Sequence, residues 1–188
     1  MTAKISFGMM LSVDGYVAGP EAGPSLPVPD EPLHRYFNEQ QRRIVLNVYG
    51  RRLYEMMRYW EDADAKPEST PVELDFATAW KDTPKVVVSA TLESVGPNAR
   101  LVKSDVVRTV SQLKAEMSGE IEVGGPTLAA SLARHGLIDE FRLYVYPVVL
   151  GGGTPFFEAK SFLQLEPLGS ERLPQNVTLL RFRPAQRT

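Results

Sequence analysis

Short apolar runs of strand type alternate with helical segments along most of this chain. The strand-type runs lie at residues 4–13, 43–50, 84–92, 99–104, 120–125, 139–151 and 176–183. Helical patterns open at residues 30–32, occupy 51–60 and 72–82, and begin again near 105 and at 126. Strands that alternate with helices predict an α/β fold with a central, mostly parallel sheet covered by helices on both faces. The last two strands have no helix between them, which predicts an antiparallel C-terminal edge.

Two polar segments interrupt this alternation. Residues 19–32 are rich in proline and glycine and are expected to be loop, and residues 61–71 are expected to form an exposed insertion. Ser104 is expected to cap the helix that follows it, with Asp105 in the first turn.

Bulk composition excludes several classes of protein. The 188 residues are 43% hydrophobic and 23% charged, which suits a single domain over residues 1–188. A net charge of −2 argues against nucleic acid and membrane partners. The absence of cysteine excludes disulfides, thiolate metal sites and thiol catalysis. No signal peptide or membrane-spanning run is recognisable, so a soluble cytoplasmic protein is expected.

Familiar catalytic motifs are absent. The sequence contains neither G-x-G-x-x-G nor a P-loop, and neither H-E-x-x-H nor a G-x-S-x-G elbow. With only two histidines, no metal site is expected. His34 is interpreted as a surface residue, and His135 as a residue of the last helical turn, where a cation suits the helix dipole.

A strand runs directly into two glycines at residues 120–126. Gly124 and Gly125 permit close approach of a ligand or unusual backbone angles, and Pro126 suits the first turn of a helix. Unpaired N–H groups at such a helix start attract phosphate. A tight strand-to-helix turn without a ligand explains the same pattern, so both interpretations stay open at this point.

Four segments together resemble a known family. They read SVDGYVAG, GRRLYE, VVSATL and IEVGGPTLAASLARHGLIDEFRLYVYPVVLGGGTPFF. In this order they resemble the dihydrofolate-reductase-like superfamily, and more narrowly the C-terminal reductase domain of the bifunctional riboflavin-biosynthesis deaminase-reductase. The resemblance spans residues 4–183 and implies an NADPH-dependent reductase. The zinc site of the deaminase half needs cysteines, which this chain lacks.

The resemblance assigns a cofactor site. It implies that Gly124 and Gly125 let NADPH lie close to the backbone, and that backbone around Pro126, Thr127 and Leu128 meets the pyrophosphate.

The resemblance further implies that Gly50 precedes a helix and that Arg51 binds the 2′-phosphate of NADPH. The planar guanidinium group of arginine can form two parallel hydrogen bonds to a phosphate. Ser89 and Thr91 are placed on the adenosine side. Without the resemblance, Arg51 reads as part of a solvated basic turn and Ser89 and Thr91 as turn caps. Many superfamily members carry threonine where this chain has Leu53, which removes one contact to the pyrophosphate.

Three functions remain open for the substrate side. The first is a reductase of a small heterocycle, most like 5-amino-6-(5-phosphoribosylamino)uracil reductase, with Asp14 as the catalytic candidate that holds or protonates the substrate. Alternatively, Asp14 caps its own turn. The second is a dihydrofolate reductase, although none of Asp30, Glu31 and His34 aligns with the acid that such enzymes carry on the first long helix. The third is a non-catalytic nucleotide-binding protein on the same fold.

A homodimer is expected from the strand at 139–151. Phe141, Leu143 and Val145 lie on one face of this strand, and Tyr144, Tyr146 and Val148 on the other. A strand near a sheet edge that is apolar on both faces needs cover, from helices or from a second subunit. The resemblance points to the same pairing.

Overall fold

The structure is a computed structural model that describes residues 2–20, 23, 25–158 and 162–185. Its strands are β1 (Lys4–Ser12), β2 (Tyr16–Ala18), β3 (Ile44–Gly50), β4 (Lys85–Val88), β5 (Ala99–Val102), β6 (Glu120–Gly124), β7 (Glu140–Tyr146), β8 (Thr154–Pro155), β9 (Leu165–Arg172) and β10 (Thr178–Pro184). Its α-helices are α1 (Glu31–Gln41), α2 (Arg51–Met57), α3 (Pro71–Asp82), α4 (Val106–Glu116) and α5 (Pro126–Arg134). Two 3₁₀ helices, η1 (Arg58–Ala65) and η2 (Pro174–Asn176), complete the described elements.

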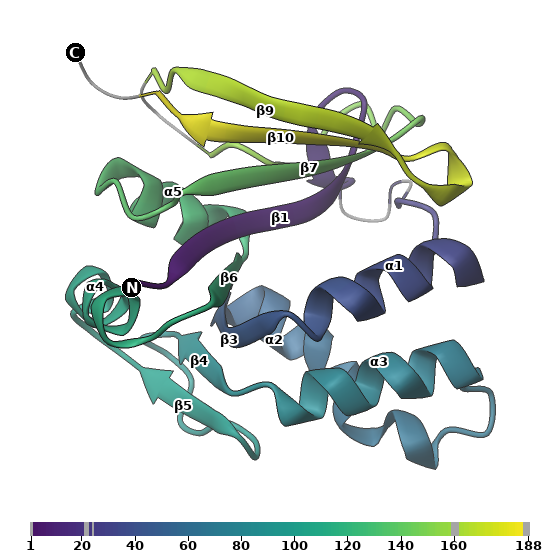
Figure 1. The fold of residues 1–188 in the computed structure, drawn as a ribbon. Coiled ribbons are helices and arrows are strands. Elements are labelled where there is room, and N and C mark those ends of the chain that lie inside the picture. The colour runs from purple at the N-terminus through teal and green to yellow at the C-terminus, as the bar shows by residue number, and fades with distance from the viewer. Residues whose placement is uncertain (1, 21–22, 24, 159–161, 186–188) are drawn as a thin grey trace.

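One large sheet crosses the molecule in the strand order β5-β4-β3-β6-β1-β7-β10-β9 (Figure 1). The strands from β5 to β7 are parallel to their neighbours. Strand β10 pairs antiparallel with β7, and β9 pairs antiparallel with β10. The predicted parallel sheet with an antiparallel C-terminal edge is therefore confirmed.

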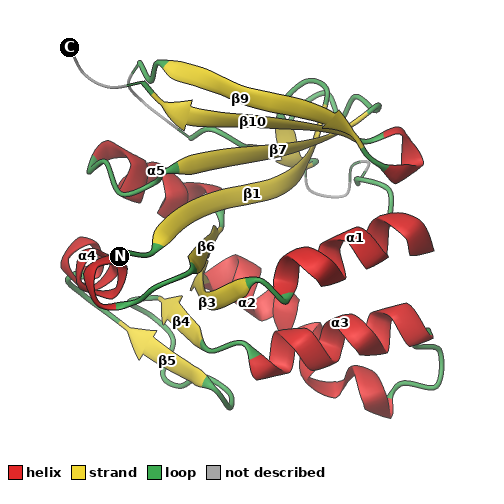
Figure 2. Cartoon of the chain, viewed as in Figure 1, coloured by secondary structure: helices red, strands yellow, loops and turns green. Residues whose placement is uncertain are grey.

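Helices cover both faces of the sheet, as predicted (Figure 2). On one face, Val110 of α4 and Leu132 of α5 join the core formed by inward-facing residues of β1 and β6. On the other face, Leu33 of α1 packs against β7 and Trp80 of α3 packs against β3. Helices α1 and α3 also contact each other, because the Asn38 side-chain amide donates to the Val72 carbonyl at 3.0 Å. The central strands of the sheet are therefore covered within a single chain, whereas the edge strand β9 is largely exposed.

Strand β7 differs from the predicted strand at 139–151 in two ways. It ends at Tyr146, because Pro147 has no N–H to continue the ladder. It also lies between β1 and β10, so it is not near the edge of the sheet. The predicted division of its side chains between two faces is confirmed, but α1 and the main core cover those faces within the chain. The exposed strand at this edge is β9.

Three further local predictions were wrong. Ser104 does not cap α4: Asp105 occupies the N-cap with φ +52° and its side chain makes no capping bond, pairing instead with Arg108 at 3.0 Å. The segment 61–71 is not wholly exposed, because η1 buries Ala63 completely. His34 is buried at 8% exposure, since α1 turns it toward the aromatic residues Trp60 and Phe76. His135 lies at the C-cap of α5, as predicted.

No helix in the described ranges is long and apolar enough to cross a membrane. In the same ranges, no cluster of three histidine, aspartate or glutamate side chains is arranged to hold a metal ion. Of the proline-rich loop at 19–32, residues 21, 22 and 24 lie outside the described residues.

Candidate functional site

Two helices begin side by side at the carboxyl edge of the sheet. Strands β3 and β6 are parallel neighbours, with Tyr49 in register with Gly124. Each strand passes into a helix without a loop, β3 into α2 after Gly50 and β6 into α5 after Gly125. A Cβ atom placed on Gly125 would lie 3.8 Å from the Gly50 nitrogen, so the two helix starts are in contact. First-turn N–H groups have no partner within their own helix, and those of α2 and α5 therefore meet in one place.

The two glycines at the end of β6 are required for different reasons. A Cβ at Gly124 would lie 2.3 Å from Leu53 Cδ2 and 2.7 Å from Tyr49 Cδ1, so close packing of α2 excludes any side chain there. Gly125 has φ +103°, a conformation that residues with a Cβ rarely adopt. The turn from β6 to α5 therefore requires both glycines for folding, whether or not a ligand approaches them.

The first turn of α5 exposes its backbone unevenly. Pro126 occupies the first helical position and contributes no N–H. Thr127 is exposed, whereas the Leu128 side chain is buried in the core and can offer only its backbone N–H to a ligand. Any anion bound here would meet Thr127 first.

Arg51 links the start of α2 to the loop that follows β4. Its Nε donates to Glu55 Oε1 at 2.8 Å, and its Nη1 donates to Thr91 Oγ1 at 2.8 Å. About half of its side chain is exposed, at 49%. Ser89 is buried, and its Oγ accepts hydrogen bonds from the N–H groups of Thr91 at 3.2 Å and Leu92 at 3.0 Å. Arg51, Ser89 and Thr91 thus come together, with Ser89 acting as a turn cap.

Asp14 is engaged by the backbone of a distant loop. Its carboxylate accepts hydrogen bonds from the N–H groups of Leu150 at 3.1 Å and Gly151 at 2.7 Å. The pKa of Asp14 is lowered, first by the Ser12 hydroxyl; desolvation opposes this shift, and the two backbone amides each add a smaller lowering. The side chain is exposed and ionised, so it can accept a hydrogen bond from a ligand but is a poor source of protons.

The loops after β1 and β7 are joined at several points around Asp14. The Val13 N–H donates to the Val148 carbonyl at 2.9 Å, and the Phe156 N–H donates to the Gly15 carbonyl at 2.9 Å. Strands β2 and β8 pair just beyond. Asp14 therefore has a structural task in fixing this pair of loops at the carboxyl end of β1.

A row of polar side chains, which the sequence did not reveal, crosses the sheet beneath α1 and α3. Register pairs place Lys85, Asn47, Glu122 and Ser6 on four adjacent strands, facing the same side. Lys85, Asn47 and Ser6 are at most 3% exposed. Burial raises the pKa of Glu122 to about 7, with Arg142 opposing the shift and Glu120 adding to it. In the sequence, the alternation of Glu120, Ile121 and Glu122 is typical of a strand with one face in water. Only the helices packed over the glutamate face show that this face is covered.

An ion cluster continues this polar layer on β7. Glu140 is 1% exposed and accepts hydrogen bonds from the Nε atoms of Arg142 and Arg181, both at 2.8 Å, and it also contacts Lys4. Arg142 additionally pairs with Glu120 at 2.7 Å. Desolvation raises the pKa of Glu140, but hydrogen bonds from Arg181, Lys4 and Arg142 outweigh it and hold the pKa at about 2.

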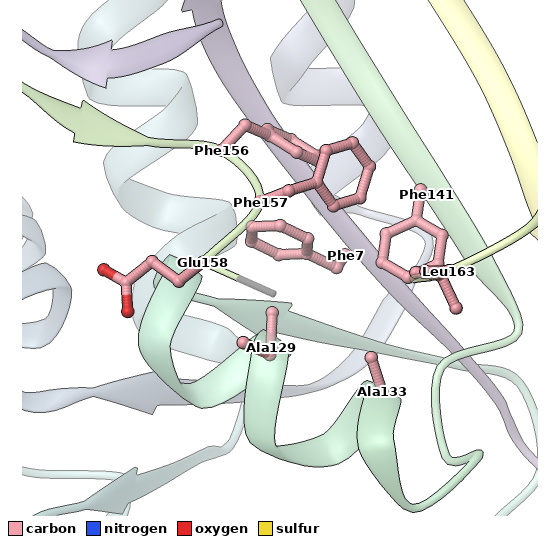
Figure 3. A pocket seen from close by; sticks show the side chains of 9 residues that line it. Phe7, Ala129, Ala133, Phe141, Phe156, Phe157, Glu158 and Leu163 are labelled. Carbon is pink, nitrogen blue, oxygen red and sulfur yellow. The ribbon is translucent and has the colours of Figure 1, made fainter. Parts of the chain in front are cut away.

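A small apolar pocket on the opposite face of the sheet is part of the core. The side chains around it come from β1, α5, β7 and the segment after β8, namely Phe7, Ala129, Ala133, Phe141, Phe156, Phe157 and Leu163 (Figure 3). Glu158 also lines it, but its carboxylate points away from the aromatic rings. The volume is about 10 Å³, roughly the space of one water molecule. This pocket is too small and too apolar to be a substrate site.

Most of this chain matches a known protein family. The model of the RibD C-terminal domain matches residues 3–179. The chain belongs to this family. Among curated proteins, it is 25% identical to the uncharacterized protein YyaP of Bacillus subtilis, over 93% of this chain and 91% of YyaP.

Solved structures of RibD-related proteins share the fold. A putative riboflavin biosynthesis protein from Shewanella sp. PV-4 superposes with a TM-score of 0.71 at 23% identity, covering 99% of this chain and 100% of that one. Dihydrofolate reductase from Enterococcus faecalis, complexed with NADP(H), has a TM-score of 0.66 at 13% identity, covering 99% and 100%. RibD from Acinetobacter baumannii has a TM-score of 0.64 at 16% identity, covering 98% of this chain and 59% of that one. The predicted dihydrofolate-reductase-like fold and the predicted family are both confirmed.

Proposed function

We propose that the protein is an NADPH-dependent reductase of a small heterocycle, most like 5-amino-6-(5-phosphoribosylamino)uracil reductase, working as one domain over residues 1–188. Membership of the RibD C-terminal domain family supports the reductase class. The observation that carries the proposal is the contact between the starts of α2 and α5, with Arg51 and Thr91 beside them. This arrangement combines unpaired backbone N–H groups with one guanidinium at the carboxyl edge of a parallel sheet, where such folds bind ligands.

The residues present fit a phosphorylated dinucleotide. Backbone at Thr127 and Leu128 would hold the pyrophosphate, because the α5 start is open there and Gly125 carries no side chain. Arg51 would exchange its bond to Thr91 for the 2′-phosphate, and Ser89 would keep the loop in shape. When bound, NADPH supplies the hydride of the reaction, and the protein orients the reactants.

Asp14 takes the role of an ionised acceptor in this proposal. The lowered pKa favours holding an N–H group of the substrate over donating a proton to it. Because its oxygens already accept hydrogen bonds from Leu150 and Gly151, the same carboxylate also joins the loop after β7 to the loop after β1. Asp14 is thus proposed as a holding residue and not as a general acid.

The geometry of α1 argues against the alternative of a dihydrofolate reductase. The sheet-facing side chains of α1 are Leu33, Tyr36 and Phe37, none of which is acidic. Asp30 lies at the N-cap and accepts a hydrogen bond from the Leu33 N–H at 3.0 Å, and Glu31 is exposed. This helix therefore presents no acid to the substrate side of the sheet. A non-catalytic nucleotide-binding protein would share the same cofactor site, so only a measurement of turnover distinguishes this alternative from a reductase.

The test is a pair of arginine variants. Arg51→Ala is expected to weaken NADPH binding by roughly 10- to 100-fold, the value of a charge-assisted hydrogen bond, while NADH binding changes little. Arg52→Ala is the matched control, since Arg52 is the adjacent exposed arginine. Equal losses for both cofactors, or a parent protein that prefers NADH, would refute the role of Arg51.

Turnover decides between the three functions. Loss of nicotinamide absorbance is followed with ribosylaminopyrimidine, dihydrofolate and quinone acceptors. Oxidation of NADPH by the aminopyrimidine supports the proposal, and rapid dihydrofolate turnover supports the second alternative. A protein that binds NADPH and reduces none of them is the nucleotide-binding protein of the third.

A further inference from the structure

Glu55 lies one turn along α2 from Arg51 and holds its guanidinium group. The Arg51 Nε donates to Glu55 Oε1 at 2.8 Å, because a spacing of four residues places both side chains on one face of the helix. Both side chains are exposed, at 49% and 44%. The arginine assigned to the 2′-phosphate is therefore already paired with a carboxylate, and the proposed function gives that carboxylate no task.

Helix stability does not explain this ion pair. Arg51 is the first residue of α2 and Glu55 lies in the last turn, so each charge stands at the end of the helix dipole that has the same sign. The stabilising order places the acid four residues before the base, as in the pair of Glu31 and Arg35 on α1. An exposed pair in the reverse order contributes little to folding. What Arg51 binds is the better explanation of its partner.

The donors of Arg51 are divided between a charged and a neutral partner. Nε is engaged by Glu55, Nη1 donates to the Thr91 hydroxyl at 2.8 Å, and Nη2 has no hydrogen-bond partner within the described part of the chain. A phosphate binds a guanidinium group through two neighbouring donors. A hydrogen bond to a carboxylate is about twice as strong as one to a neutral hydroxyl, so an incoming phosphate displaces Thr91 and leaves Glu55 in place.

Glu55 then acts on a bound phosphate in two opposite ways. Its bond to Nε fixes the plane of the guanidinium group, so that Nη1 and Nη2 stay directed toward the loop that carries Thr91. Its negative charge neutralises part of the charge of Arg51 and repels a phosphate on the same guanidinium group. In an exposed site, such a like-charge contact changes affinity by about two- to fivefold. A ribose with a hydroxyl in place of the phosphate carries no charge and escapes this repulsion.

We propose that Glu55 is a specificity-determining residue of the nucleotide site. It holds Arg51 in position for the 2′-phosphate, and its charge lowers the preference for NADPH over NADH. This inference rests on the proposed function, and it names the residue that sets how strongly the site separates the two cofactors.

The test is a fluorescence titration of NADPH and of NADH with the variant Glu55→Gln. Glutamine keeps an oxygen that accepts the bond from Nε but carries no charge. NADPH is expected to bind the variant about two- to fivefold more tightly than the parent at low salt, whereas NADH binding stays unchanged. The gain is expected to fall toward zero as the salt concentration rises from about 0.02 M to 0.5 M, because exposed charges are screened.

Two further variants separate position from charge. Glu55→Ala removes the same charge but leaves Nε without its partner, so it is expected to bind NADPH more weakly than Glu55→Gln. Glu39→Gln is the matched control: Glu39 pairs with Arg42 at 2.6 Å on the last turn of α1, and strand β3 separates this exposed ion pair from the start of α2. The control is expected to bind both cofactors like the parent. Circular dichroism establishes that each variant is folded.

Four results would each overturn the inference: unchanged NADPH affinity in Glu55→Gln, an equal gain for NADH, a gain that persists at high salt, or the same gain in Glu39→Gln. Glu55→Ala binding NADPH as tightly as Glu55→Gln would overturn the holding role. Arg51→Ala keeps the inference separate from the proposed function. If Arg51→Ala loses NADPH while Glu55→Gln has no effect, Glu55 is excluded and the cofactor site stands. A parent protein that binds neither cofactor overturns the proposed function and this inference together.

Discussion

Glu140 is the most enclosed charge of the polar layer, and replacing it isolates the contribution of that layer to stability. Its carboxylate is 1% exposed and receives the Nε donors of Arg142 and Arg181 at 2.8 Å each, with Lys4 as a third cation. Glu140→Gln preserves the shape of the side chain but removes the charge that these cations surround. The variant is therefore expected to lose stability through electrostatics and not through packing.

The size of the loss follows from the pKa of Glu140. Desolvation alone would raise it, but the hydrogen bonds from Arg181, Lys4 and Arg142 bring it from 4.5 to about 2. A shift of that size corresponds to roughly 3 kcal/mol, in line with the cost of breaking a buried ion pair. Because the pKa is lowered on folding, this stability is complete above about pH 4.5 and is lost as the pH falls toward 2. Glu140→Gln should therefore cost about 3 kcal/mol at neutral pH and progressively less in acid.

Urea unfolding at several pH values, followed by tryptophan fluorescence at fixed protein concentration, measures this difference. Glu166→Gln is the matched control, because Glu166 pairs with Arg183 at 2.7 Å on a neighbouring strand but both side chains are exposed. The control is expected to cost less than about 1 kcal/mol. A Glu140→Gln cost below about 1 kcal/mol at neutral pH, or a cost that stays constant between neutral pH and about pH 3, would refute the reasoning.

Three other expectations concern the site and the assembly. Gly125→Val should lower the melting temperature and abolish NADPH binding. The control Gly136→Val, which strains a left-handed residue just beyond the C-terminal end of α5, should lower the melting temperature alone. A folded Gly125→Val variant that binds NADPH like the parent would place the cofactor elsewhere. Asp14→Asn should weaken the hold on Leu150 and Gly151, raising KM without moving the pH profile of turnover, and a lost ionisation near neutral pH would mean that Asp14 does donate a proton. Although β7 is covered within the chain, the family resemblance still predicts a homodimer in sedimentation, and a mass near 20.9 kDa at micromolar concentration would contradict this.

The sequence alone determined most of the central strands and the helices, but it did not predict β2, β8 and β9 or the exact ends of β7 and α4. Periodicity and turn chemistry are local properties, so the strands, the helices and the glycine turn before Pro126 could be predicted from neighbouring residues. The absence of a helix between the last two strands likewise predicted the antiparallel edge. Motifs of the four family segments then indicated a cofactor site at Gly50, Arg51 and the Gly124–Gly125 pair, whose close grouping the structure supports by placing β3 beside β6.

Tertiary structure decided which surfaces are covered. Strand β7 carries apolar residues on both faces, but only the strand order shows that it is interior and that β9 forms the edge. Glu122 lies on a strand whose alternation is equally compatible with a solvated face, and Asn47 is a single polar residue in the apolar run of β3. His34 lies on a helix whose exposed side cannot be read from its spacing. His34 and Asn47 are buried, and Glu122 is partly covered, because α1 and α3 pack over the same face of the sheet. Burial depends on contacts between segments far apart in the chain. It is burial that raises the pKa of Glu122 and that leaves the Asn47 amide without a partner among the described residues.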